Sequence, residues 1–147
     1  NARLGDPETQ ATLPLFDGDF ADIAYLAAVG KLEKAEFKIA SGAACCVVMS
    51  SGGYPLGYKT GYPIHGLDHP HQNTLLFQAG MTTRNGQLVT NGGRVLSVVG
   101  LGDSLSQART NAYAYVKNVS FKDAYHRKDI GTDNPARSRN KRKATQL

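Results

Sequence analysis

The sequence lacks any long apolar run. None approaches the ~18–20 residues that a helix needs to cross a bilayer, so we expect a soluble, cytoplasmic protein with no membrane partner. Cysteine is scarce, and the two cysteines, Cys45 and Cys46, are adjacent in an apolar run. Adjacent cysteines rarely pair with each other, and a single C-C pair is not a zinc pattern. We therefore interpret both as reduced strand residues rather than as a redox or metal site.

Several catalytic patterns are missing as well. The phosphate-binding loop GxxxxGK[ST] is absent, and no Ser-His-Asp or Cys-His pairing can be defended. Histidine is rare, but His65, His69 and His71 cluster with Asp68 in "HGLDHPH". Histidines at this spacing are one way to build a zinc site. An exposed loop, favoured by the neighbouring Pro, Asn and Gln, is the other interpretation.

Negative charge is sparse, and the net charge of +5 is unevenly placed. From Thr132 to the end, five cations face one anion, so residues 1–131 carry only about +1. This polar segment with its charge run predicts a basic, disordered tail over 132–147. No aromatic residue lies within "RSRNKRK" to stack on bases, so nucleic acid is not the expected main partner.

What the chain does have is the pattern of an α+β domain. Its 147 residues suffice for one domain with a substantial core. The spacing of apolar residues predicts a helix over roughly 18–30 and a buried strand over 43–49. A second helix is predicted in "SLSQARTNAYAYVKNV", capped by Ser104 or Asp103.

Turn signals divide the rest of the sequence. A Gly- and Pro-rich loop follows the first strand, and Asn85-Gly86 predicts a type I′ hairpin. Another strand should follow "TNGGR", and a last short strand is predicted near "VSF" or "AYHRKDI". Strands that follow one another in this way are prone to antiparallel pairing, so the predicted class is α+β.

The two Gly-rich turns are candidate anion sites. In "SGGYPLG" and "TNGGR", backbone N–H groups can converge on an anion, and an adjacent Arg adds charge. Ordinary hairpin chemistry explains the same glycines, and spacing alone leaves both interpretations open.

Four stretches taken together suggest a family. "NARLGDPETQ", "VVMSSGGYPLGYKTG", "TNGGRVLSVVGLG" and "YHRKDIG" resemble, in order and spacing, the phosphoribosylamine–glycine ligases of de novo purine biosynthesis. The resemblance covers about residues 1–131. It implies that 1–30 form the terminal segment of an ATP-grasp domain. Residues 31–131 would then form a C-terminal α+β domain, a small antiparallel sheet with flanking helices.

The resemblance also implies a reaction and its cofactors. These ligases join glycine to 5-phosphoribosylamine through glycyl phosphate, using ATP and Mg²⁺ (or Mn²⁺). By resemblance, Asn1 binds the metal and the nucleotide, and Arg3 lies near the transferred phosphoryl group. Asp6 and Glu8 would be catalytic groups that hold an ammonium or amine on the substrate side. Asp6 has a second interpretation, as a turn or cap residue in "GDPE".

Further roles follow for the C-terminal part. Asn91, Gly92, Gly93 and Arg94 would approach the substrates, with Arg94 as the anion contact. The segment "RKDIG" (127–131) either contacts substrate or holds the domain together through ion pairs.

The family pattern places a Glu two residues before Asn1. We therefore expect a C-terminal fragment, or one half of a split ligase. Such a chain needs the N-terminal and ATP-binding portions and is expected to be inactive alone. The alternative is a non-catalytic fragment or partner-binding module derived from that enzyme.

Three positions depart from the family pattern. The usual Asp is replaced by Gly57, the usual His by Gln78 and the usual Thr by Met81. If those family groups touch substrate, activity should suffer. If they are structural, the replacements are neutral.

Overall fold

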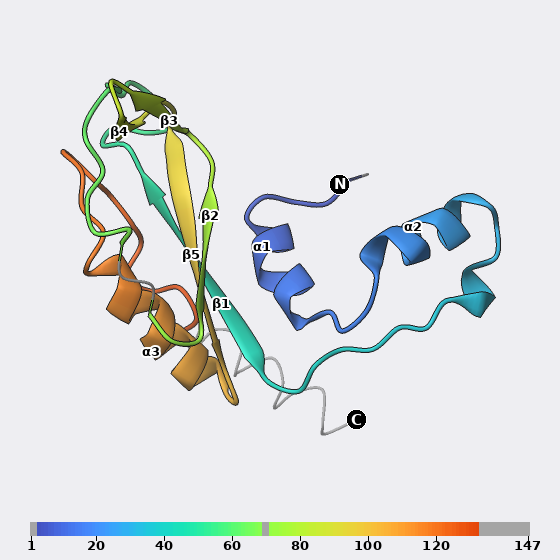
Figure 1. The fold of residues 1–147 in the computed structure, drawn as a ribbon. Helices are drawn as coiled ribbons and strands as arrows, with labels where there is room; N and C mark the ends of the chain where they lie inside the picture. The colour runs from blue at the N-terminus through green and yellow to red at the C-terminus, as the bar shows by residue number, and fades with distance from the viewer. Residues whose placement is uncertain (1–2, 69–70, 133–147) are drawn as a thin grey trace, which may run out of the picture.

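The computed structural model describes residues 3–68 and 71–132. The chain begins with four short helical segments, followed by five strands and one longer helix (Figure 1). The helical segments are α1 (Glu8–Thr12), η1 (Leu13–Leu15), α2 (Phe20–Ala28), η2 (Leu32–Lys34) and α3 (Leu105–Val116), and the strands are β1 (Ala43–Ser50), β2 (Thr74–Gln78), β3 (Met81–Arg84), β4 (Gln87–Thr90) and β5 (Arg94–Gly102). The predicted basic tail lies outside the described residues, apart from Thr132.

The main sheet has three antiparallel strands in the order β1-β5-β2. Its centre is β5, whose run from Val95 to Gly100 is entirely buried. Val47 of β1 and Leu76 of β2 both stand opposite Val98, in the middle of the sheet. The predicted strand at 43–49 is confirmed, because β1 covers it and adds Ser50.

Helix α3 covers one face of this sheet (Figure 1). Ser104 Oγ accepts a hydrogen bond from Gln107 N at 3.2 Å, so of the two predicted caps Ser104 is the one used. The helix buries Ala108, Ala112, Tyr115 and Val116 against the strands. Small residues let the backbones approach closely: a Cβ at Gly100 would collide with the Ala108 carbonyl and the Ala112 amide.

Strands β3 and β4 form a separate two-stranded sheet. Asn85 and Gly86 connect them with φ of 51° and 78°, which is the geometry of a type I′ turn. The hairpin predicted from "NG" is therefore confirmed.

The last predicted strand is wrong. The described part of the region after α3, residues 117–132, makes only isolated bridges, His65 with Ser120 and Ser50 with Tyr125. A strand needs consecutive pairs along one neighbour. This segment instead touches two different neighbours once each.

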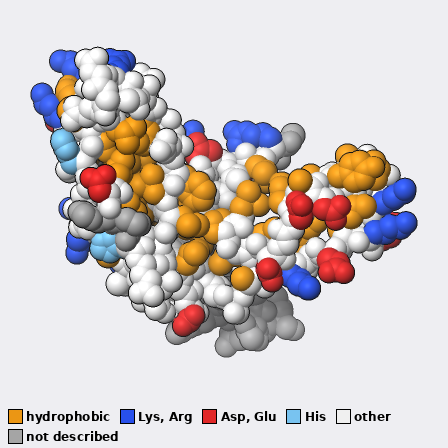
Figure 2. All heavy atoms as spheres, in the orientation of Figure 1, with side chains coloured by type: hydrophobic (Ala, Val, Ile, Leu, Met, Phe, Trp, Pro, Cys, Tyr) orange, Lys and Arg blue, Asp and Glu red, His pale blue; other side chains and the backbone are white. Residues whose placement is uncertain are grey.

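Residues 3–41 form an arm that extends from the sheet (Figure 1). Asp19 caps α2 by accepting from Ala21 N at 2.8 Å, in agreement with the helix predicted over 18–30. The chain then folds back, with the Asp17 amide donating to the Lys38 carbonyl at 3.0 Å. No residue of the arm's four helical segments is buried, and Figure 2 shows hydrophobic side chains spread over its surface.

Within the described ranges, the longest helix is α3, with 12 residues. No helix there combines the length and the apolar character that crossing a bilayer requires.

Candidate functional site

An open cleft of about 340 Å³ lies where the arm meets the main sheet. It brings together side chains from the arm, from β1, from the start of β5 and from the C-terminal segment. Its lining is Pro7, Cys46, Val48, Ser50, Tyr54, Arg94, Tyr125, Arg127 and Ile130. The mixture of two guanidinium groups, two phenol rings and an apolar floor suits a small anionic molecule with an apolar part.

Arg94 joins the two sides of the cleft. Its Nη1 donates to the main-chain carbonyl of Asp6 at 2.7 Å, and its Nη2 lies 3.4 Å from Asp6 Oδ2. Both side chains are partly exposed, at 40% and 45%. The structure therefore brings together two residues that the sequence placed in separate roles, one on the amine side and one as an anion contact.

The other arm residues lie around the start of α1. Asp6 Oδ1 accepts from Gln10 Nε2 at 2.9 Å. Asp6 does not cap α1, because the cap position is Pro7 and no side chain accepts from the first amides of the helix. The Glu8 carboxylate folds back against Gly5, where an added Cβ would collide with it. Arg3 Nη1 donates to the Leu4 carbonyl at 3.1 Å and is not joined to Asp6 or Glu8. Asn1 lies outside the described residues.

The turn "NGG" is held by its neighbours. Ser51 donates to it twice at 2.8 Å, from Oγ to the Gly92 carbonyl and from N to the Gly93 carbonyl. A Cβ at Gly93 would collide with the Tyr54 ring, so this glycine is required by close packing. Asn91 Oδ1 accepts from Arg84 Nη2 at 3.3 Å. The hairpin interpretation of these glycines thus has a physical basis, while their carbonyls, not their N–H groups, are the ones that Ser51 holds.

Arg127 forms the second cation of the cleft. It makes a two-pronged ion pair with Asp129, Nε to Oδ1 at 3.0 Å and Nη2 to Oδ2 at 2.6 Å. The hydrogen bond from Arg127 lowers the pKa of Asp129 below its ordinary value. The segment is also attached to α3, since Arg109 Nε donates to the Ile130 carbonyl at 3.0 Å and Tyr113 Oη donates to the Arg127 carbonyl at 2.6 Å. These contacts fit the ion-pair interpretation of "RKDIG".

Cys46 is on the cleft floor but is a poor nucleophile. Burial raises the pKa of its thiol to about 11, although a hydrogen bond with Ser97 opposes the shift. The thiol is therefore protonated near neutral pH, and the thiolate is the reactive form. Both cysteines are free and lie in β1, as predicted.

The histidine cluster predicted from the sequence lies only partly within the described residues. No group of three or more His, Cys, Asp or Glu side chains converges there. His71 instead packs on the Tyr115 ring at 5.3 Å between centroids, and its Nε2 lies 2.6 Å from Asn118 Nδ2. His69 lies outside the described residues.

Sequence reasoning missed Tyr54 and Tyr125. Tyr54 lies in "SGGYPLG", a turn whose glycines predicted an anion site or a hairpin but gave no indication of a role for the ring. Tyr125 pairs with Ser50 through two backbone hydrogen bonds of 2.8 and 2.9 Å. That pairing brings its ring to the cleft, and no local pattern signals a contact between positions so far apart.

The described residues form a small α+β domain with an N-terminal arm, and the cleft lies where the two meet. A family model described as "Phosphoribosylglycinamide synthetase, C domain" matches residues 44–133. The chain belongs to this family, which confirms the resemblance drawn from the four sequence stretches.

Individual relatives agree with this assignment. The chain is 47% identical over 135 residues to a phosphoribosylamine–glycine ligase of Fusobacterium nucleatum, covering 90% of this chain and 32% of the relative. It is 44% identical over 130 residues to a bifunctional purine biosynthetic protein of Schizosaccharomyces pombe, covering 88% of this chain and 16% of that protein.

A solved structure shares the fold. The crystal structure of a phosphoribosylamine–glycine ligase from Thermotoga maritima matches with a TM-score of 0.69 and 32% identity, over 86% of this chain and 31% of that one. The chain thus spans at most about a third of the length of these relatives. The predicted α+β class with small antiparallel sheets is confirmed.

Proposed function

We propose that this chain is the C-terminal part of an ATP-dependent ligase that joins glycine to 5-phosphoribosylamine through glycyl phosphate, in de novo purine biosynthesis. The observation that carries the proposal is the C-domain match over residues 44–133. Relatives that continue well beyond this chain bear the name phosphoribosylamine–glycine ligase. ATP binding and most of the reacting groups are assigned to the portion of the ligase that this chain does not span.

We further propose that the arm is the end of an ATP-grasp domain. The resemblance implies that this segment ends at residue 30, whereas the arm continues to residue 41. Residues 31–41 accompany the arm, because Phe16 pairs with Ile39 and the Ala40 amide donates to the Leu15 carbonyl at 2.8 Å. The arm's apolar surface supports this assignment. Among the described residues, more than half of the large apolar side chains that stand exposed lie in the arm, namely Leu4, Phe20, Tyr25, Val29, Leu32, Phe37 and Ile39. Such a surface needs a covering partner.

In the proposed reaction, the cleft receives the substrate that carries negative charge. A guanidinium has five N–H donors, so the contact between Arg94 and Asp6 leaves donors for a ligand anion. Asp6 and Glu8 are proposed to hold the substrate amine, since carboxylates are the natural partners of an ammonium. Asn91, Gly92 and Gly93 shape the turn that carries Arg94 to the cleft.

Arg3 and the metal are proposed on the resemblance alone. Arg3 would stabilise the transferred phosphoryl group, and Asn1 would hold Mg²⁺ (or Mn²⁺) through its amide oxygen. The described side chains do not by themselves form a metal site, so we derive no step through the ion.

The test is a chimeric ligase. This chain replaces the matching third of the Fusobacterium nucleatum ligase, and ADP release is measured with and without glycine and 5-phosphoribosylamine. We expect ADP release that depends on both substrates from the chimera, and none from the 147-residue chain alone. Glycine-dependent ADP release by the isolated chain would contradict the assignment of the ATP site to the missing portion.

The control restores the three departures in the same chimera, by Gly57→Asp, Gln78→His and Met81→Thr. A folded chimera that binds ATP but releases no ADP, and gains activity when these are restored, would favour the alternative. In that alternative the chain is a non-catalytic, partner-binding module derived from the ligase.

A further inference from the structure

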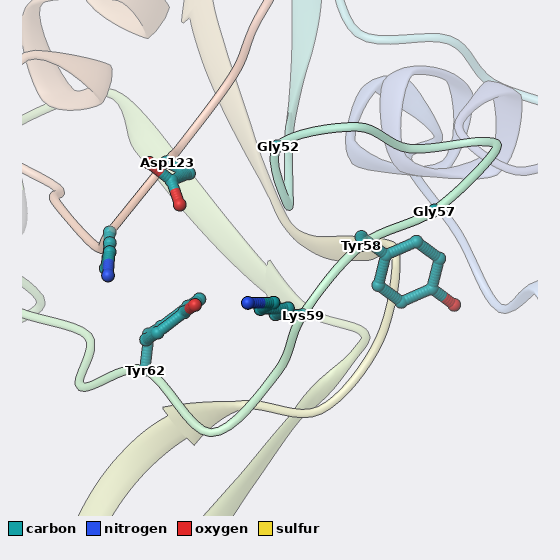
Figure 3. A pocket seen from close by; sticks show the side chains of 7 residues that line it. Gly52, Gly57, Tyr58, Lys59, Tyr62 and Asp123 are labelled. Carbon is teal, nitrogen blue, oxygen red and sulfur yellow. The ribbon is translucent and has the colours of Figure 1, made fainter.

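A second pocket, of about 500 Å³, lies on the other side of the loop that bears Tyr54. Its walls come from residues 52–62 and from the turn after Phe121 (Figure 3). Tyr54 and Tyr58 connect it to the cleft, since their rings meet edge to face at 6.0 Å and each lines one of the two pockets. The proposed ligase reaction assigns no role to this second pocket.

The pocket holds two lysines without carboxylate partners. Neither Lys59 nor Lys122 forms a salt bridge within the described part of the chain. Lys122 Nζ lies 5.2 Å from the centroid of the Tyr62 ring, and Figure 3 shows Lys59 and Tyr62 pointing toward one another. Asp123 also lines the pocket, so the formal charge of its lining side chains is +1.

The backbone that carries these groups is fixed. Tyr62 is attached to β4 twice, since its amide donates to Thr90 Oγ1 at 3.1 Å and its carbonyl accepts from Thr90 N at 2.8 Å. On the opposite wall, Gly52 packs so closely on Asp123 that an added Cβ would lie 2.7 Å from the Asp123 carbonyl oxygen. A ligand would therefore meet a preformed wall and would have to order only the ends of two lysine side chains.

Gly57 lines the pocket at a position that accepts a side chain. A Cβ added there would meet nothing within 4 Å, and its φ is not in the left-handed region. The glycine is thus not demanded by packing or by backbone conformation. A side chain at this position would extend into free space on the pocket wall.

We propose that this pocket is an anion-binding site that takes a small molecule bearing a phosphate group. Two lysine ammonium groups suit a doubly charged phosphate as point charges. The rings of Tyr58 and Tyr62, which also line the pocket, supply apolar edges beside them. The volume is in the range of small-molecule sites. The inference does not rest on the ligase reaction and would hold for the chain on its own.

The experiment titrates inorganic pyrophosphate into the full 147-residue chain, with calorimetry and backbone amide chemical shifts as readouts. We expect shifts centred on Gly52, Gly57 and Lys122, with a dissociation constant tighter than about 1 mM, weakening as salt is added. ADP should bind at least as well as pyrophosphate, because its base adds contact with Tyr62. Binding of adenosine without binding of pyrophosphate overturns the proposal, as do shifts scattered over all surface lysines.

A charge series makes the test specific. Asp123→Asn suits the positive φ of 58° at that position, keeps the shape and removes the competing carboxylate. It should tighten binding by about fivefold. Gly57→Asp adds a carboxylate into open space and should weaken binding by about fivefold. The matched control Gly57→Asn adds the same bulk without charge and should change affinity by less than about twofold. Equal effects of Gly57→Asp and Gly57→Asn would overturn the proposal, since bulk and not charge would then be the cause.

Discussion

Arg94 contacts Asp6 across 88 positions of sequence, and the exposure of the pair decides what the contact does. Both side chains are nearly half exposed. Ion pairs in such surroundings contribute only about 0–1 kcal/mol to stability. We therefore expect the pair to add little to fold stability, and we propose that it places the guanidinium at the cleft.

Arg94→Ala in the chimeric ligase tests this role. We expect activity to fall about 100-fold, as when one preorganised charged donor is lost, with a change in unfolding free energy below about 1 kcal/mol. Steady-state kinetics and urea unfolding measure the two quantities. The control is Lys117→Ala, which removes an exposed cation at the end of α3 that does not line the cleft. Similar losses of activity in both variants would contradict the role given to Arg94.

His126 sets a pH dependence of stability. Its ring lies 6.1 Å from that of Tyr113, and burial, followed by the nearby Lys128, lowers its pKa below the ordinary value. The unfolded chain therefore takes up this proton before the folded chain as pH falls. This contribution to stability is present above about pH 6.5 and is lost as pH drops below it.

The measurement is thermal unfolding of the wild-type chain and of His126→Asn, between about pH 7.5 and about pH 5. We expect the wild type to lose more stability over this range than the variant does. Parallel curves would show that His126 is not responsible.

At the scale of elements, the contact between β5 and α3 depends on Gly100. Gly100→Ala places a methyl group against the Ala108 carbonyl and the Ala112 amide, which are backbone atoms that cannot rotate away. We expect a loss of about 3 kcal/mol in unfolding free energy, measured by urea denaturation. Gly57→Ala is the matched control, because its methyl group meets open space. A loss below about 1 kcal/mol at Gly100 would mean that the helix shifts at little cost.

The same scale shows what a sequence can and cannot predict. The hairpin at Asn85-Gly86 is local chemistry, because two residues that tolerate positive φ determine the turn. The strand predicted after Val119 is wrong for a non-local reason. Its apolar pattern is real, but pairing depends on neighbours, and Ser120 and Tyr125 meet different ones.

In the cleft, too, contacts between distant segments could not be predicted from the sequence. The resemblance predicted Arg94 and Asp6 as site residues; that role stays a prediction, and the structure shows that the two are in contact. Neither local spacing nor the resemblance indicated that contact, and the rings of Tyr54 and Tyr125 were missed for the same reason. Packing between segments that are far apart in the sequence produces no periodic residue pattern in either segment.

At the scale of the whole molecule, the arm and the domain differ in how well they are packed. The core lies in residues 45–121, while Phe37 and Ile39 of the arm are each 64% exposed. Removing residues 1–41 should therefore leave the domain folded, with a melting temperature within about 5 °C of the full chain, and should reduce self-association. Circular dichroism and size-exclusion chromatography measure the two effects.

A double variant tests whether self-association depends on the apolar side chains of the arm or on the arm as a whole. Phe37→Ser with Ile39→Ser should reduce self-association of the full chain. Leu56→Ser should not, because Leu56 is 92% exposed but belongs to the loop after β1 and not to the arm. Loss of the domain's cooperative unfolding after removal of the arm would contradict the division proposed here.

The order of strands in the main sheet has a consequence for biosynthesis. Strands β1 and β2 flank β5, and β5 comes last of the three in the chain. On a ribosome that adds about 5–20 residues per second, the apolar β1 emerges several seconds before β5, its one partner strand among the described residues. During that interval its backbone groups have no strand to pair with. The nascent chain thus passes through a stage in which β1 is an unpaired apolar segment that chaperones can bind. Synthesis of β5 ends this stage, because β5 pairs with both β1 and β2.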